Sequence, residues 1–133
     1  MNIPTKTLRK SIGESADVAR RWFESRTESK SRKIFEAKDQ LGDTREGAVY
    51  VYYGQGDAVL YVGQTNRNVK ARLHDQTSPH KKQPWWSQWK TMRFVNLPDE
   101  MDRLVLEFML ILAYLPLFNE KPKAKNFNEL LPD

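Results

Sequence analysis

Residues 47–63, GAVYVYYGQGDAVLYVG, decide which fold this chain adopts. Two alternating runs rich in Val and Tyr flank the loop Gly54-Gln55-Gly56-Asp57, and this pattern predicts a β-hairpin. With those four residues as the loop, Tyr50 pairs with Tyr61, and Tyr52 lies beside them on the same face. The opposite face carries Val49, Val51, Leu60 and Val62. The hairpin therefore has an apolar side for packing and a phenolic side on which chemistry is possible.

Length and composition bound the class of protein. A chain of 133 residues is long enough for one domain with a sizeable core, and 29% charged residues favour solubility. The absence of cysteine excludes disulfides and cysteine-based zinc sites and suits a reducing cytoplasm. The longest apolar run, residues 108–115, is too short to span a bilayer. We therefore expect a cytoplasmic protein without a membrane span.

The positive charge is concentrated in the middle of the chain. Residues 47–97 carry seven basic and two acidic side chains, whereas residues 1–46 carry eleven and eight, and residues 98–133 carry four and seven. A basic middle flanked by nearly balanced ends indicates a positive surface that attracts a polyanion such as nucleic acid. Many soluble proteins are basic without binding nucleic acid, so charge alone is weak evidence.

Residues 5–45 read as a charged helical extension. Ser11 with Glu14 predicts a capping box, and an apolar stripe follows at helical spacing around Trp22 and Phe23. We favour an extension that packs on the core. The alternative, a basic arm on DNA or a dimer contact, would use Arg20, Arg21, Lys30, Arg32 and Lys33.

A helix is expected over residues 69–77, with Asn68 as its cap. Arg72 shares a face with Asn68, whereas His74 lies about 200° around the helix from Arg72. Neither His74 nor His80 has the spacing of a metal site or of a nucleophile–base pair. We therefore expect both histidines at the surface.

The segment 78–90, SPHKKQPWWSQWK, interleaves lysine with tryptophan. Such side chains can pair with phosphates and stack on bases, but the tryptophans can equally cap one end of the core. Including the turn and helix before it, the candidate nucleic-acid contacts are Arg67, Lys70, Lys81, Lys82, Trp85 and Trp86.

A third strand is expected over residues 91–97, followed by a helix from Glu100 to about Leu115 with Asp99 as its N-cap. This helix is apolar around most of its circumference, so we expect it to be largely buried. Glu107 is the exception. One alternative is that Glu107 forms an i, i+4 ion pair with Arg103. The other is that Glu107 binds a cation, because a carboxylate among apolar neighbours is energetically costly unless a cation neutralises it.

The order of these elements resembles the GIY-YIG nuclease family over residues 47 to about 120. The matching positions are Ala48-Val49-Tyr50 preceded by Gly47, Tyr61-Val62-Gly63, Arg72 within NVKARL, Glu107 within VLEFMLIL, and Asn119 within Pro-Leu-Phe-Asn. The short spacing from Glu107 to Asn119 is most similar to the nuclease domain of bacterial excision-repair endonucleases, while the helical extension is more like compact restriction-type members. Two departures are Ala48 in place of the leading glycine, and Gln76 where several members have histidine.

The resemblance implies an α+β fold with a small three-stranded antiparallel sheet flanked by helices. Residues 1–46 would be the helical extension, 47–120 the nuclease core and 121–133 a loosely ordered tail. It also implies hydrolysis of DNA by one Mg²⁺ or Mn²⁺, leaving a 5′-phosphate and a 3′-hydroxyl.

The resemblance also implies a role for each site residue. Tyr50 would act as general base or position the attacking water, Tyr61 would orient it, and Arg72 would neutralise the phosphate. Glu107 would bind the metal, and Asn119 would tether the site. For this to work, Arg72 and Glu107 must converge on an open face bearing Tyr50 and Tyr61.

Two other classes stay open at this point. One is a non-catalytic nucleic-acid-binding module that keeps the fold, and a weaker one is a protein-interaction domain. The sequence also leaves open duplex, branched or single-stranded DNA or RNA as substrate, and a possible homodimer.

Overall fold

The computed structural model describes residues 5–36, 45–74 and 78–119. The elements in chain order are α1 (Thr5–Arg26), β1 (Lys30–Ser31), α2 (Arg32–Glu36), β2 (Glu46–Tyr53), η1 (Gln55–Asp57), β3 (Val59–Asn68), α3 (Val69–His74), η2 (Pro79–Lys82), β4 (Thr91–Asn96) and α4 (Glu100–Tyr114). Within the described ranges, no helix is long and apolar enough to cross a membrane. The loosely ordered tail expected over residues 121–133 lies outside them.

The predicted α+β fold with an antiparallel sheet is confirmed, but the sheet has four strands in the order β1-β4-β2-β3. The fourth strand comes from the N-terminal extension, where Lys30 pairs with Met92 and Ser31 with Thr91. Three strands were expected because a two-residue strand leaves no alternating pattern to detect. The extension thus continues the sheet, and β3 forms the opposite edge.

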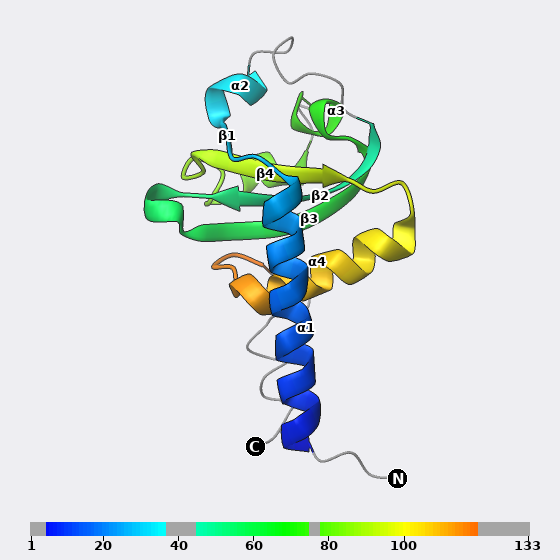
Figure 1. Cartoon of the computed structure of the whole chain (residues 1–133). Helices are drawn as coiled ribbons and strands as arrows, with labels where there is room; N and C mark the ends of the chain where they lie inside the picture. The colour runs from blue at the N-terminus through cyan, green and yellow to red at the C-terminus, as the bar shows by residue number, and fades with distance from the viewer. Residues whose placement is uncertain (1–4, 37–44, 75–77, 120–133) are drawn as a thin grey trace.

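The sheet separates two layers of helices (Figure 1). On one face, α2, α3 and the tryptophan segment 78–90 cover Tyr50 and Tyr52. On the other face, α4 and Phe23 of α1 cover Val49, Val51 and Val62. The N-terminal half of α1 extends beyond α4, away from the sheet.

The predicted hairpin forms, but its expected register is wrong. Tyr50 pairs with Gly63 and Tyr52 with Tyr61, and a bulge separates the Tyr52 and Tyr53 pairs. Because the bulge adds a residue on β3, Leu60 joins the core on the tyrosine face instead of the valine face. Between Tyr50 and Tyr52 the observed pairing is shifted by two residues from the expected one. Because side chains alternate with a period of two, Tyr50, Tyr52 and Tyr61 still share one face.

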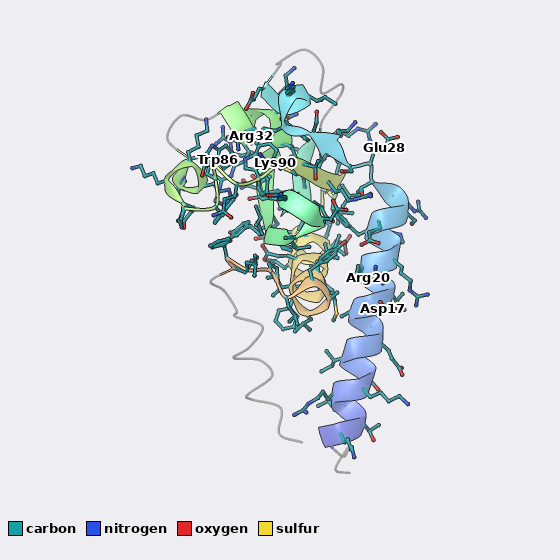
Figure 2. All side chains as sticks on the ribbon, turned by 90° about the vertical axis from the view of Figure 1, so that its left-hand side faces the viewer. Asp17, Arg20, Glu28, Arg32, Trp86 and Lys90 are labelled. Carbon is teal, nitrogen blue, oxygen red and sulfur yellow. The ribbon has the colours of Figure 1, made fainter. Side chains whose placement is uncertain are left out.

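Helix α1 runs through the predicted capping box, so Ser11 lies inside the helix and does not begin it. Four of the five basic residues named for the arm have acidic or backbone partners: Asp17 binds Arg20 and Arg21, and Glu28 binds Lys30. Arg32 binds Glu36 and donates to the carbonyl of Trp86, against which it lies (Figure 2). These local pairs favour the packing extension over a basic arm.

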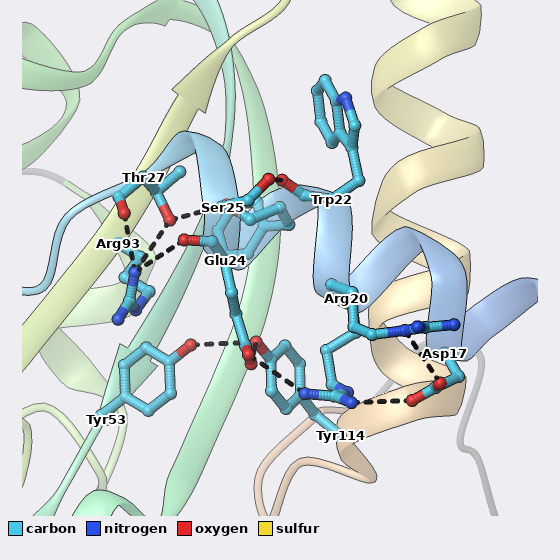
Figure 3. Close-up of polar contacts among 11 residues, drawn as sticks. Asp17, Arg20, Trp22, Glu24, Ser25, Thr27, Tyr53, Arg93 and Tyr114 are labelled. Carbon is cyan, nitrogen blue, oxygen red and sulfur yellow. Dashed lines mark hydrogen bonds and ion pairs between the residues drawn. The ribbon is translucent and has the colours of Figure 1, made fainter.

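A polar network joins α1 to the sheet and to α4 (Figure 3). The Tyr114 hydroxyl donates to Glu24 at 2.6 Å, and the Tyr53 hydroxyl donates to Tyr114 at 3.2 Å. From β4, Arg93 donates to the Thr27 carbonyl at 2.8 Å. The extension is thus anchored by directed hydrogen bonds as well as by Phe23.

Helix α4 begins as predicted, because the Asp99 side chain accepts from the Asp102 amide at 2.9 Å. The expectation that α4 is largely buried is wrong: Leu106, Leu110 and Ile111 face the sheet, but Met101 is 65% exposed and Val105 is 50% exposed. Apolar residues around the whole helix do not determine how many other elements of the fold pack against it, so burial on every side did not follow.

Arg103 is the buried charge that fixes the entry of α4. It donates to Gln64 and to the carbonyls of Leu97 and Pro98, all within 3.0 Å. Gly47 lies against this group with φ of 86°. A Cβ at position 47 would lie 2.5 Å from the Leu97 oxygen and 2.6 Å from the Arg103 guanidinium.

We predict that Gly47→Ala lowers the free energy of unfolding by about 1–3 kcal/mol, because it combines a positive φ with a clash against backbone. Urea unfolding measures this. The matched control is Gly13→Ala in α1, where a Cβ meets nothing within 4 Å. That control should stabilise by about 0.5–1 kcal/mol, and equal effects of the two substitutions would contradict the account.

Candidate active site

A pocket of about 380 Å³ opens at the β3 edge of the sheet. Both layers contribute, because Arg72 comes from α3 on one face and Glu107 comes from α4 on the other. The lining residues are Tyr61, Arg72, Pro79, His80, Gln83, Trp85, Glu107, Phe118 and Asn119. Four of the five predicted catalytic residues therefore meet in one pocket.

Tyr61 lies on the edge strand, half-buried, with its ring stacked on Trp85 at 4.9 Å and an interplanar angle of 12°. Trp85 itself is 1% exposed and also packs on Tyr52. The stack holds the Tyr61 ring in one orientation. Of the three tyrosines on this face of the sheet, Tyr61 is the one that lines the pocket.

Tyr50 does not line the pocket. It is 2% exposed, and burial raises the pKa of its hydroxyl, an effect that its hydrogen bond to Arg72 partly opposes. The ring lies over Gly63, where a Cβ would be 2.7 Å from the Tyr50 hydroxyl. The expectation of an open tyrosine face is wrong, because the tryptophan segment and His80 cover that face.

Arg72 is presented by the short helix α3, which begins where the Asn68 side chain accepts from the amides of Lys70 and Ala71. The predicted cap is therefore confirmed. One terminal nitrogen of Arg72 lies 3.3 Å from His80 Nε2, and its Nε is buried without a partner in the described part of the chain. The half-buried guanidinium provides the positive charge of the pocket.

Glu107 has no ion-pair partner within the described residues. The i, i+4 pair with Arg103 does not form, because Arg103 turns to Gln64 and the carbonyls before α4. Burial raises the pKa of the Glu107 carboxyl to about 7. An unpaired carboxylate in a polar pocket is a position at which a cation would lower the free energy.

Asn119 fastens the segment after α4 to the sheet edge. Its side-chain oxygen accepts from the Val62 amide and its nitrogen donates to the Val62 carbonyl, each at 2.8 Å. Leu117 and Phe118 donate to the carbonyls of Val59 and Leu60. The segment therefore pairs with β3 like a short additional strand and closes one wall of the pocket.

His80 was expected at the surface, and that expectation is wrong. It is half-buried, and its ring lies 5.0 Å from the Tyr61 ring and 6.0 Å from the Tyr50 ring. No spacing rule along the chain could have found it, since the loop brings it to the pocket through space. The side chain of His74 and all of Gln76 lie outside the described residues.

The predicted nucleic-acid contacts differ in how much of each side chain is exposed. Trp85 is buried beneath Tyr61, so it cannot present an open face to a base. Trp86, Lys70 and Lys81 are half-buried. Arg67, near the end of β3, and Lys82, on η2, are exposed. For these five residues, nucleic-acid contact stays a prediction.

Glu107 is the one carboxylate among the described residues that line this pocket. In the described ranges, no three His, Cys, Asp or Glu side chains lie close enough to hold a metal. One carboxylate, Glu107, and the oxygens of water and substrate are the kind of shell that Mg²⁺ accepts. Glu107 is thus the residue that would hold such an ion.

Part of the chain is similar in sequence to known proteins. Residues 46–120, more than half of the chain, match the sequence profile of the UvrC-like GIY-YIG domain. Over 80 residues the chain is 38% identical to UvrABC system protein C of Mycoplasma genitalium. That match covers 58% of this chain and 13% of the relative, so the chain spans a small part of the relative's length. No solved structure matches the chain.

We predict that Glu107→Gln stabilises the metal-free protein at pH 8 but not at pH 4.5. The folded-state pKa of about 7 lies above the ordinary value of 4.5, so the stabilising contribution of the neutral acid is present below pH 4.5 and lost as pH rises through 7. The variant should gain about 1–3 kcal/mol at pH 8, measured by urea unfolding in EDTA. An equal difference from the parent at both pH values would contradict the burial of this carboxylate.

Proposed function

Because the chain belongs to the UvrC-like GIY-YIG family, as its sequence predicts, we propose that it is a divalent-metal-dependent DNA endonuclease. It would hydrolyse phosphodiester bonds to 5′-phosphate and 3′-hydroxyl ends. The observation that carries the proposal is the meeting of Tyr61, Arg72 and Glu107 in one pocket at the β3 edge, where Glu107 has no ion-pair partner among the described residues.

Arg72 would bind the phosphate, because a guanidinium matches two phosphate oxygens in a planar fork and stays charged at all relevant pH values. Its position on α3 places this charge across the pocket from Glu107. The positive charge of Arg72 would stabilise the transition state more than the bound substrate, because negative charge accumulates on the phosphoryl oxygens during attack.

Glu107 would hold Mg²⁺ or Mn²⁺, which when bound supplies charge stabilisation for the leaving 3′-oxygen. Since Glu107 offers one carboxylate, substrate phosphate would complete the shell, and metal affinity would be weak without DNA. The raised pKa of Glu107 supports this assignment, as does the absence of a cationic partner for it in residues 5–36, 45–74 and 78–119.

Tyr61 would orient the attacking water through its hydroxyl, since it is the tyrosine that borders the pocket. The sequence-based hypothesis also gave Tyr50 a role at this water, as general base or positioner, which its burial does not support. Tyr50 is buried and hydrogen bonds to Arg72, so it would position the guanidinium instead. Asn119, fixed to Val62, would hold the wall of the pocket in place.

We predict that the protein nicks or cuts plasmid DNA with Mg²⁺ or Mn²⁺, and that Glu107→Gln and Arg72→Ala each reduce the rate at least about 100-fold. Tyr61→Phe should slow cleavage far more than Tyr52→Phe, because Tyr52 is buried away from the pocket. A gel assay with supercoiled, single-stranded and branched substrates and end mapping measures this, with circular dichroism as the folding control. Binding without cleavage in either metal would favour the non-catalytic binding module.

We further predict that the Mg²⁺ concentration giving half-maximal cleavage rises about tenfold for each pH unit below 7. Protons and the metal compete for the Glu107 carboxylate, whose pKa is about 7. Cleavage rates against MgCl₂ at pH 5.5, 6.5, 7.5 and 8.5 test this. A half-maximal concentration that does not change between pH 5.5 and 7.5 would remove Glu107 from the metal site.

A further inference from the structure

His80 comes from η2, in the loop between α3 and β4, and its ring lies among the aromatic rings of the pocket. The nearest ring centres are those of Tyr61 at 5.0 Å, Trp85 at 5.6 Å and Tyr50 at 6.0 Å, all in edge-on or tilted contact. The imidazole is therefore fixed on several sides. Its one hydrogen-bond partner in the described part of the chain is Arg72, at 3.3 Å.

The contact with Arg72 determines the protonation of His80. A guanidinium has donors and no acceptor, so His80 Nε2 must accept through its lone pair. The imidazole is then neutral and carries its proton on Nδ1. Burial and the nearby Arg72 charge both lower the pKa of His80, to about 4, which agrees with this state.

The turns of this loop do not use the imidazole as a hydrogen-bonding group. They are made by backbone bonds: Lys81 donates to Ser78, Gln83 to His80 and Trp86 to Gln83. Trp85 and Trp89 bury the loop against the sheet. The hydrogen-bonding capacity of His80 is therefore directed to the pocket, while its ring packs against the neighbouring aromatic rings.

Arg72 has few other constraints. Helix α3 has six residues, and Arg72 Nε is buried without a partner in the described ranges. Among the described residues, the guanidinium contacts His80 and the Tyr50 hydroxyl. We propose that His80 is a positioning residue, whose neutral imidazole accepts a hydrogen bond from Arg72 and fixes the guanidinium toward the scissile phosphate. This rests on the proposed nuclease function.

The first test needs no substrate. Long-range ¹H–¹⁵N NMR on the full chain should show that the His80 imidazole is neutral at pH 6, with Nδ1 protonated and Nε2 unprotonated. The charged side chains that line the same pocket are Arg72 and Glu107, so Glu107→Gln checks that the carboxylate does not set the state. A charged His80 at pH 6, or a proton on Nε2, would overturn the proposal.

The second test separates the acceptor from the ring. His80→Phe keeps an aromatic ring but removes the acceptor, and should lower the single-turnover cleavage rate about 10- to 100-fold, the equivalent of one hydrogen bond to a charged group. His80→Gln places an oxygen near the Nε2 position and should stay within about fivefold of the parent. DNA affinity, measured by fluorescence anisotropy, should change less than the rate in both variants. The exposed Ser87→Ala in the same loop is the matched control.

The outcomes distinguish this proposal from the proposed function. If His80→Phe and His80→Gln lose equal activity, the ring and not the hydrogen-bond acceptor matters, and the positioning role is wrong. If His80→Phe cleaves DNA at the rate of the parent protein, His80 has no role in the reaction. A parent protein that cleaves no substrate refutes the nuclease function, while the NMR result still decides whether His80 accepts from Arg72.

Discussion

The pairing of Tyr50 with Gly63 is the constraint on which the rest of the site depends. Only a residue without a Cβ lets the Tyr50 ring lie across β3, since a Cβ would come within 2.7 Å of its hydroxyl. That register places Tyr52 opposite Tyr61 and the bulge at Leu60. It buries Tyr50 behind Arg72 and leaves Tyr61, on the edge strand, facing the pocket.

The location of the pocket follows from the edge position of β3. An edge strand has unpaired backbone groups that must be covered, and here the segment ending at Asn119 covers them. Because the edge is where the two helical layers approach each other, it is also where Arg72 of one layer and Glu107 of the other can meet. The same hydrogen bonds therefore protect the sheet and close the site.

Sequence patterns predicted the features that depend on neighbouring residues. The caps at Asn68 and Asp99, the three longer strands, the apolar face of Val49 and Val51, and the family all follow from short-range patterns. The register did not, because the bulge at Leu60 depends on how β3 packs. His80 and Arg103 were missed for the same reason: their partners lie in other elements, and only the fold determines whether a charge meets a carbonyl or a carboxylate.

The electrostatics of the pocket explain why one arginine and one glutamate do not simply neutralise each other. If Arg72 paired with Glu107, the pKa of that carboxyl would fall, but burial raises it to about 7 and Arg72 is directed to His80 and Tyr50. The protein thus holds its two charges apart across the pocket. A phosphate beside Arg72 and a cation beside Glu107 would complement both at once, whereas either alone would leave one charge unmatched. Such a site would bind metal and nucleic acid cooperatively, since each ligand supplies the charge that the other requires.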